Sequence, residues 1–338
     1  MVRVGIIGLG GMGNMHFGIY ETNENAKVVA LADADPNKLK PGESALTINI
    51  GTGAARIDPS RHKLYNNADD LISNPDVDLV DICLPTYMHP EYMIKAIKAG
   101  KHVLCEKPMA LTYEECRKVL NMLRGKRTRL MIAQCIRFWP EYVYLKETVD
   151  SGRLGKVLSA YFWRGGSAPT WSWDNWFLNH KRSGGFILDL HIHDADFVHY
   201  LFGKPAAVCS SGAIGPTSGF DIVDTLYIYK KKMSVHAGAN MALPPGFGFE
   251  MKYAVSFEKG CLVFSSAHSP TLTEIVGSEK KFPELKKTDG YREEIAYLVR
   301  CLEKDQRPAV AMPQSSAFSV QLIEAEIKSV KTGKVVKL

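Results

Sequence analysis

The sequence predicts an α/β protein that begins with a doubly wound parallel sheet and continues into a second α/β domain. Short apolar runs alternate with helix-like segments as far as residue 134, a pattern that indicates parallel strands joined by helices. A glycine-rich turn, Gly8-Leu9-Gly10-Gly11-Met12-Gly13, joins the first apolar run to the first helical one. From Phe138 onward, some strand-like runs are joined by short polar turns, which favours antiparallel hairpins.

The glycine-rich turn is predicted to bind a dinucleotide. It follows the apolar strand Val2–Ile7 and opens a helix that runs to about Tyr20. Glycines permit a tight turn and let the backbone approach a pyrophosphate, which the N-terminus of the helix attracts. The predicted cofactor contacts in this turn are Gly8, Gly10, Gly11, Met12 and Gly13.

The second predicted strand, Lys27–Ala32, is followed by Asp33, which lies 20 residues after Gly13. A carboxylate at this position accepts hydrogen bonds from the hydroxyls of the adenosine ribose and repels a 2′-phosphate. Ala34 supplies no positive charge to offset that repulsion. NAD is therefore favoured over NADP as the cofactor.

Further polar residues follow later strands of the first domain. Pro36–Ser60 is expected to be an irregular crossover, because its prolines and glycines would break a helix. After it, strands and helices are predicted at 64–65, 68–73, 77–84, 91–99, 102–105, 113–123 and 130–134. Pro85-Thr86 and Glu106-Lys107 then fall at carboxyl ends of strands, where such sheets bind ligands. These four residues and His89 complete the predicted cofactor contacts.

The second domain is expected to span residues 135–338, after a first domain of residues 1–134. It begins with a helix to Ser151 and a strand at 156–164, followed by an aromatic loop, Trp171–Phe177. A helix is expected after Gly184-Gly185. Further strands are predicted at 206–214, 221–229, 233–241, 249–257 and 261–264, and helices at 291–303 and 315–331.

The segment Ser183–Asp196 packs three carboxylates and two histidines among apolar residues. In a continuous helix Asp189 and His193 are separated by about 40° around the axis, so both side chains share one face. An imidazole there suits a general base, which the carboxylate can orient, although the pair taken alone fits a structural role equally well. About 200° separates His191 from His193, which argues against a chelate, and no metal site is predicted.

The composition is that of an ordinary globular protein, with 46% hydrophobic and 23% charged residues and a net charge of +6. The densest basic run, Lys230–Lys232, lies between two predicted strands and indicates a solvated hairpin tip, so no nucleic-acid partner is expected. No apolar run approaches the ~18 residues that cross a bilayer, and no signal peptide is apparent. Seven cysteines without a C-x-x-C pair suggest reduced thiols and a cytoplasmic location.

Together the motifs resemble the Gfo/Idh/MocA oxidoreductase family. The resemblance rests on Gly8–Gly13, Pro85-Thr86 with His89, Glu106-Lys107-Pro108, and Ser183-Gly-Gly with Asp189 and His193. It implies an N-terminal Rossmann domain and a C-terminal domain with an open, mostly antiparallel sheet, through which the chain forms a homodimer or homotetramer. Two positions depart from the family pattern, since Phe186 replaces its third glycine and His191 replaces a small residue.

At the matching positions, the resemblance implies that Lys107, Asp189 and His193 form the catalytic set. The implied reaction transfers a hydride between NAD(P) and a secondary alcohol of a sugar, inositol or related polyol. The Lys107 ammonium is suited to stabilise a developing alkoxide. Two alternatives stay open: an NAD-dependent glycosidase that oxidises its sugar transiently, and a non-catalytic sensor of the same fold.

The aromatic loop before the catalytic segment is a candidate wall of the substrate site. Indole faces stack against the C–H surface of a pyranose, although a packed lid is the usual fate of such tryptophans. The predicted substrate contacts are Trp171, Trp173, Trp176, Asn175 and Arg164.

Overall fold

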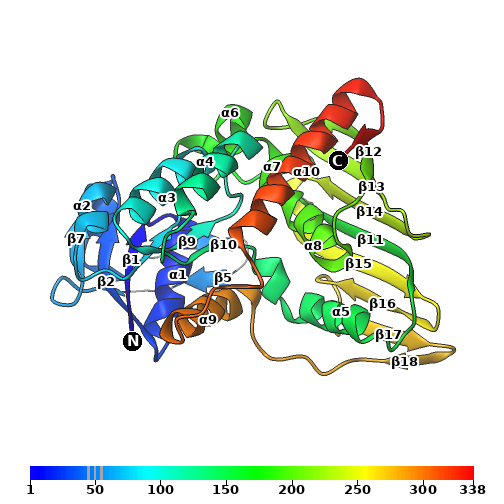
Figure 1. Ribbon diagram of the computed structural model, residues 1–338, viewed down its shortest axis with the longest axis horizontal. Coiled ribbons are helices and arrows are strands. Elements are labelled where there is room, and N and C mark those ends of the chain that lie inside the picture. Colours follow the sequence, from blue (N-terminus) through cyan, green and yellow to red (C-terminus); the bar gives the residue numbers. More distant parts are fainter. Residues whose placement is uncertain (44–45, 49–50, 54–55) are drawn as a thin grey trace. The chain divides into compact units, whose positions relative to one another are not determined.

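The computed structural model describes residues 1–43, 46–48, 51–53 and 56–338 (Figure 1). Its contacts divide the chain into two compact units, Met1–Cys135 with Gly290–Ala317, and Ile136–Asp289 with Phe318–Leu338. Residues 290–317, which the sequence alone placed in the second domain, therefore cluster with the first unit.

The first unit is built on a six-stranded parallel sheet in the order β10-β9-β8-β1-β2-β7. All four residues of β8 and of β10 are buried, as expected for parallel strands that are covered on both faces. The predicted doubly wound sheet is thus confirmed. The strands are β1 (Val2–Ile7), β2 (Ala26–Ala32), β7 (Lys63–Tyr65), β8 (Leu79–Ile82), β9 (His102–Glu106) and β10 (Leu130–Ala133).

Helices join these strands close to the predicted positions. A capping box formed by Thr112 and Glu115 starts α4, since each side chain accepts a backbone N–H of the other residue. A helix from the later part of the chain, α9 (Gly290–Glu303), contacts α1, β1 and β10. The other helices are α1 (Gly11–Glu21), α2 (Ala68–Ser73), α3 (His89–Lys98) and α4 (Tyr113–Leu123), with a 3-10 turn, η2, at Thr86–Met88.

The crossover from β2 to β7 contains no α-helix in the part that is described. It holds a 3-10 turn, η1 (Pro36–Leu39), and two short antiparallel pairs. This agrees with the irregular crossover expected from the prolines and glycines. The pairs are β3 (Gly42–Glu43) with β6 (Arg56–Ile57), and β4 (Leu46–Ile48) with β5 (Gly51–Gly53); the rest of residues 44–55 lies outside the described residues.

The second unit is built on a nine-stranded sheet in the order β18-β17-β16-β15-β11-β14-β13-β12-β19. Only the β11–β14 pairing is parallel among the described ladders of this sheet, so the mostly antiparallel sheet is confirmed. Three of its strands, at 272–276, 279–281 and 336–337, were not predicted. The strands are β11 (Val157–Gly166), β12 (Ala207–Ile214), β13 (Phe220–Ile228), β14 (Ser234–Asn240), β15 (Phe249–Phe257), β16 (Gly260–Ser265), β17 (Leu272–Val276), β18 (Glu279–Lys281) and β19 (Val336–Lys337).

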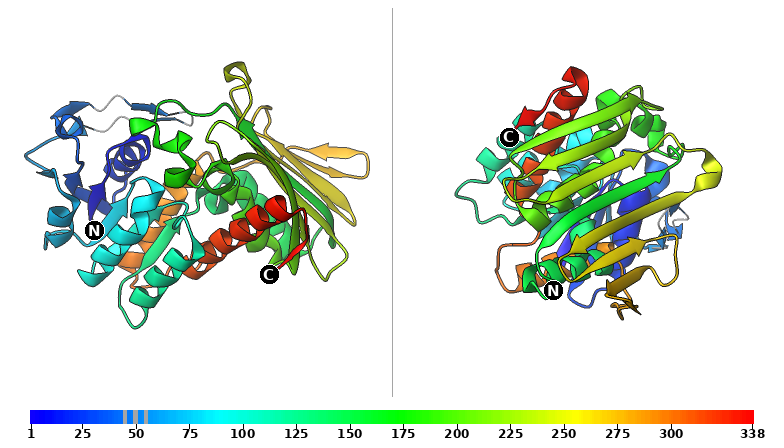
Figure 2. Two further views of the ribbon diagram at one scale, coloured as in Figure 1. Left: turned by 90° about the horizontal axis from the view of Figure 1, so that it is seen from above. Right: turned by 90° about the vertical axis from the view of Figure 1, so that its right-hand side faces the viewer.

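Helices cover one face of this sheet. They are α5 (Pro140–Ser151), α8 (Ile192–Phe202) and the part of α10 (Pro313–Thr332) from Phe318 onward. Figure 2 shows the opposite face of the sheet with no helix in front of it. Within the described residues, no helix is both long enough and apolar enough to cross a bilayer.

Candidate functional site

The glycine-rich turn follows β1, where Gly8 has a φ of 91°. A Cβ on Gly8 would lie 2.6 Å from the carbonyl oxygen of Cys83, and one on Gly13 would lie 1.8 Å from that of Gly8. A Cβ on Gly10 would meet nothing within 4 Å. Backbone packing therefore requires Gly8 and Gly13, whereas Gly10 leaves the N-terminus of α1 open to a ligand, as a pyrophosphate needs. Gly11 and Met12, both half-buried, form the first turn of α1.

Asp33 lies directly after β2 and is held by the glycine-rich turn. Its Oδ2 accepts the N–H of Leu9 at 2.7 Å, and its Oδ1 accepts the N–H of Asp35 at 2.9 Å. The Lys38 Nζ lies 3.3 Å from the same Oδ2. Ala34 supplies no positive charge, as expected, but Lys38, five residues after Asp33, supplies one that was not predicted from the sequence.

Pro85 and Thr86 follow β8, and His89 begins α3. Within the described residues, the buried Thr86 Oγ1 has no hydrogen-bond partner, which fits a hydroxyl that binds a ligand. The His89 ring is 1% exposed and lies between two carbonyl oxygens, with Pro108 O 2.8 Å from Nδ1 and Leu84 O 2.7 Å from Nε2. Burial lowers the pKa of His89. His89 thus links the loops after β8 and β9, and its contact with the cofactor stays a prediction.

Glu106 and Lys107 are supported by a buried histidine that the sequence did not single out. Glu106 Oε2 accepts the N–H of Lys107 at 3.0 Å, and Glu106 Oε1 lies 3.3 Å from Nε2 of His16 on α1. The other ring nitrogen of His16 lies 2.9 Å from Asp81 Oδ2 in β8. Burial disfavours a charge on His16, yet its neighbours Cys83 and Asp81 raise its pKa well above the usual value. The His16 ring therefore connects the glycine helix to two neighbouring strands.

Two groups of side chains in the first unit have the spacing of metal ligands. They are His16–Asp81–Cys83 and His16–Glu106–Glu294, and the ligand atoms of each group lie within 4.8 Å of one another. Both groups use His16, whose Nδ1 lies within hydrogen-bond distance of Asp81 Oδ2. Burial raises the pKa of the Cys83 thiol, which favours the neutral thiol over the thiolate that binds metals. Neither group includes His191 or His193. The absence of a metal stays a prediction.

Residues 180–202, called the catalytic segment after the proposed roles of Asp189 and His193, do not form the continuous helix expected from the sequence. The segment comprises α6 (His180–Ser183), α7 (Phe186–Asp189) and α8, with Leu190 and His191 between the last two. The N–H groups of Leu190 and His191 both donate to the carbonyl of Phe186, at 3.0 and 2.9 Å. This i→i−5 contact widens the backbone, so the 40° separation of Asp189 and His193 in an ideal helix does not apply. Asp189 ends α7 and His193 lies in the first turn of α8, each 7% exposed.

Buried charged residues on α8 bind partners on other elements. Asp194 accepts hydrogen bonds from Nε and Nη2 of Arg164 on β11, at 2.5 and 2.8 Å. Asp196 accepts Nε and Nη2 of Arg137, each at 2.7 Å, and the hydroxyl of Ser319 at 2.6 Å. Burial alone would raise the pKa of Asp196, but Arg137 holds it well below the usual range. The two carboxylates that follow His193 in sequence are thus fixed by bidentate contacts.

The predicted substrate contacts differ in their surroundings. Trp171 and Trp173 are 46% and 57% exposed, Trp176 is half-buried, and Asn175 is exposed. Trp176 stacks on Phe177, whereas Trp173 lies beneath the guanidinium of Arg182. Arg164 is 2% exposed and is bonded to Asp194, so its observed contacts favour positioning of that carboxylate over direct contact with a substrate.

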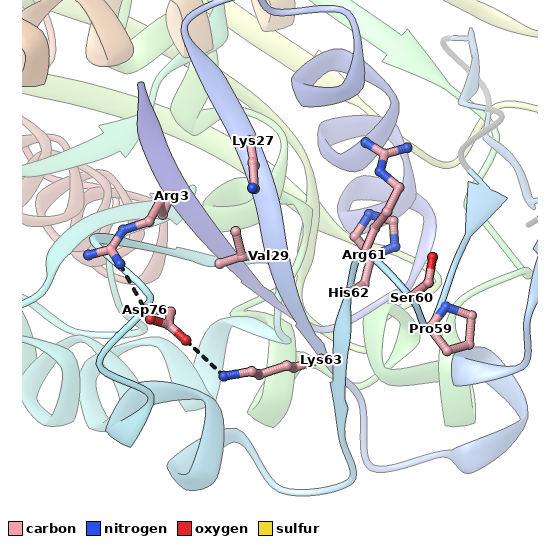
Figure 3. A pocket seen from close by; sticks show the side chains of 9 residues that line it. All are labelled: Arg3, Lys27, Val29, Pro59, Ser60, Arg61, His62, Lys63 and Asp76. Carbon is pink, nitrogen blue, oxygen red and sulfur yellow. Dashed lines mark hydrogen bonds and ion pairs between the residues drawn. The ribbon is translucent and has the colours of Figure 1, made fainter.

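Lys107, half-buried, belongs to the first unit, whereas Asp189 and His193 belong to the second. Figure 3 shows a pocket of about 320 Å³ in the first unit, and no residue of the glycine-rich turn lines it. Arg3 and Lys27, at the amino ends of β1 and β2, line it, and an ion pair joins Asp76 to Lys63 at 2.8 Å. It therefore sits at the wrong end of the strands for the predicted cofactor. Its lining comprises Arg3, Lys27, Val29, Pro59, Ser60, Arg61, His62, Lys63 and Asp76.

Two family models match the chain. Residues 2–134 match the one described as an oxidoreductase family with an NAD-binding Rossmann fold, and residues 142–263 match the Gfo/Idh/MocA C-terminal domain.

Similar proteins cover the chain almost completely. The inositol 2-dehydrogenase of Rhizobium meliloti (strain 1021) is 27% identical over 97% of both chains. The myo-inositol 2-dehydrogenase of Thermotoga maritima is 26% identical over 100% of this chain and 98% of its own. A structure of levoglucosan dehydrogenase with NADH and levoglucosan has a TM-score of 0.84 at 20% identity over 99% of both chains, which shows a shared fold. The family models together span most of the sequence, and the chain belongs to the Gfo/Idh/MocA oxidoreductase family, with its NAD-binding Rossmann domain.

Proposed function

We propose that this oxidoreductase transfers a hydride between NAD and a secondary alcohol of an inositol, sugar or related polyol. One observation carries the proposal: Lys107, Asp189 and His193 are all present in a chain whose full-length relatives include inositol 2-dehydrogenases. Retention of all three groups favours an enzyme over a sensor that only binds a dinucleotide.

Each residue has a role suited to its chemistry. His193 takes the proton of the substrate hydroxyl as general base, and Asp189 orients the imidazole or holds a neighbouring hydroxyl. The Lys107 ammonium stabilises the developing alkoxide. Bound NAD supplies the hydride acceptor. Thr86, Glu106 and the glycine-rich turn hold the cofactor in place.

Asp33 supports NAD over NADP, and Lys38 reduces that preference. The carboxylate is available to the ribose hydroxyls and opposes a 2′-phosphate through like charge. The Lys38 ammonium, 3.3 Å from Asp33 Oδ2, offsets part of this repulsion. We therefore expect NADP to be used measurably, but less efficiently than NAD.

The open face of the nine-stranded sheet supports a homodimer or homotetramer. Tyr161 and Val263 on this face are 42% and 40% exposed, and they alternate with buried residues such as Phe162 and Phe264. A second copy would bury these apolar side chains. Combined Tyr161→Arg and Val263→Glu substitutions should produce a monomer in light scattering; an unchanged mass would exclude this face as the interface.

Free cysteines support a cytoplasmic location. No disulfide joins any of the seven cysteines, all of which lie among the described residues, and four of them, including Cys105, are buried. Reduced thiols are usual in the cytosol.

A panel of inositols, free sugars and glycosides, assayed with NAD and with NADP at the NADH absorbance band and for released aglycone, tests the proposal. NADH formation with a free polyol supports the dehydrogenase and excludes a glycosidase as the sole activity. Release of an aglycone without net NADH would favour the glycosidase. Dinucleotide and sugar binding without turnover of any kind would favour the sensor and overturn the proposal.

A further inference from the structure

The break between α7 and α8 lies between the two proposed catalytic side chains in sequence. Asp189 is the last residue of α7, and His193 is the second residue of α8. Any change in the backbone at Leu190 and His191 therefore changes the direction of one side chain relative to the other. No glycine or proline stands at these positions, so the break requires another cause.

His191 at this break is fully buried and reaches α10. Its Nε2 lies 2.9 Å from Oε2 of Glu326, and both side chains have 0% exposure. The Tyr227 hydroxyl on β13 donates to Glu326 Oε1 at 2.8 Å and lies 3.4 Å from the same ring nitrogen. A polar side chain in such surroundings is costly unless its contacts are kept, so the backbone that carries it has little freedom.

The polar contacts continue into the sheet. Thr225 donates to Glu326 Oε2 at 3.2 Å, and the hydroxyls of Thr225 and Ser210 are 2.8 Å apart. His191 is thus tied through Glu326 to α10 and through Tyr227 and Thr225 to β13. The break is held by elements outside the catalytic segment.

We propose that His191 and Glu326 are positioning residues, whose buried contact holds the break in one geometry and so fixes where Asp189 and His193 point. The side chains that they position act as the proposed function assigns, and on that the inference rests. Arg164 and Arg137 restrain later residues of α8, whereas His191 restrains the break itself.

The test compares His191→Leu, which loses the contact, with His191→Gln, whose amide retains a donor for Glu326. His191→Leu should lower kcat by about 100-fold, the usual cost of a displacement near 1 Å, with unchanged NADH binding measured by fluorescence. His191→Gln should recover most of kcat. Wild-type kcat in a folded His191→Leu variant would overturn the proposal.

A double variant separates positioning from stability. His191→Leu with Glu326→Leu also removes the carboxylate that has lost its histidine partner, and it should recover most of the melting temperature, because apolar replacement of a buried pair is often neutral. Positioning predicts that kcat stays low in this stable variant, whereas a purely structural role predicts that activity returns. Glu274→Gln is the matched control, since it removes a buried carboxylate that binds Arg153 and Tyr144, and it should leave kcat unchanged.

An NMR titration of the His193 imidazole gives a result that does not depend on turnover. A changed midpoint or chemical shift in His191→Leu, with no change in Glu274→Gln, supports positioning. An unchanged His193 signal in the folded His191→Leu variant would contradict it. If no polyol is oxidised by the wild type, the proposed function fails while this measurement still decides the positioning role.

Discussion

The cofactor edge of the first unit and the catalytic segment of the second are built in different ways. At the cofactor edge, glycines, strand ends and neighbouring backbone amides fix the geometry, as in the 2.7 Å bond from Leu9 N–H to Asp33. In the catalytic segment, long-range side-chain contacts fix it, as in Arg164–Asp194 and Arg137–Asp196, separated by 30 and 59 residues. Short motifs therefore shape the proposed cofactor edge, whereas tertiary contacts fix the helix that carries the proposed general base. Substitutions in the two regions should therefore affect different steps: cofactor binding in the first unit and turnover in the second.

Loss of His193, the proposed general base, gives the largest expected effect and tests the second unit by itself. His193→Ala should lower kcat by about 1,000-fold, within the range for general-base catalysis, while the dissociation constant of NADH stays unchanged. Steady-state kinetics and NADH fluorescence make the two measurements. His199→Gln, on the same helix but bonded to Ser319, serves as the control. Weakened NADH binding in His193→Ala would show that the two regions do not fail separately.

The first unit also contains a long-range polar contact, His16–Asp81, and its removal should cost stability. His16→Asn should lower the free energy of unfolding by about 3 kcal/mol, because a buried carboxylate loses its partner. The pKa of His16 is raised in the folded state, so its contribution is full below about pH 6.5, the unfolded value. It is lost as the pH rises through the folded pKa. Urea unfolding at pH 6 and pH 9 should therefore show a larger difference between variant and wild type at pH 6; a larger difference at pH 9 would contradict the assigned charge.

Cofactor choice should depend on the first unit alone. Asp33→Ser should shift the ratio of kcat/KM for NAD over NADP by about 30-fold toward NADP, because a like-charge repulsion is removed. Lys38→Met should move the ratio in the opposite direction by a smaller factor. Parallel assays with both cofactors and one polyol measure the ratio. An unchanged ratio in both variants would show that the Asp33 carboxylate does not discriminate between the ribose hydroxyl of NAD and the 2′-phosphate of NADP.

The aromatic loop gives the smallest expected effect. Trp173 is 57% exposed, so Trp173→Ala should change the unfolding free energy by less than about 0.5 kcal/mol. If the indole stacks on a sugar, KM for the polyol should rise by about fivefold with little change in kcat. Phe282→Ala, which removes an equally exposed aromatic ring (59%) from the second unit, is the comparison variant. Equal KM values in the two variants would remove Trp173 from the substrate wall.

The sequence was sufficient for elements with a local signature. Alternating apolar runs predicted both sheets, and the strand before Gly8 and the helix after Gly13 supported the cofactor edge. It could not predict the break at His191, because the cause lies in Glu326 on a distant helix and no local residue signals it. Lys38 and His16 were missed for a related reason, since only the folded chain brings them to Asp33 and Asp81.

The assignment of α9 to the first unit bears on how the protein can be dissected. The chain passes between the units after residues 135, 289 and 317, so no single cut separates them. A fragment of residues 2–134, the length of the first family match, would lack α9 and its buried Ile295, Leu298 and Val299. Expression trials of the isolated nucleotide-binding part should therefore graft residues 290–317 back through a linker, because homology boundaries here do not coincide with a cooperative folding unit.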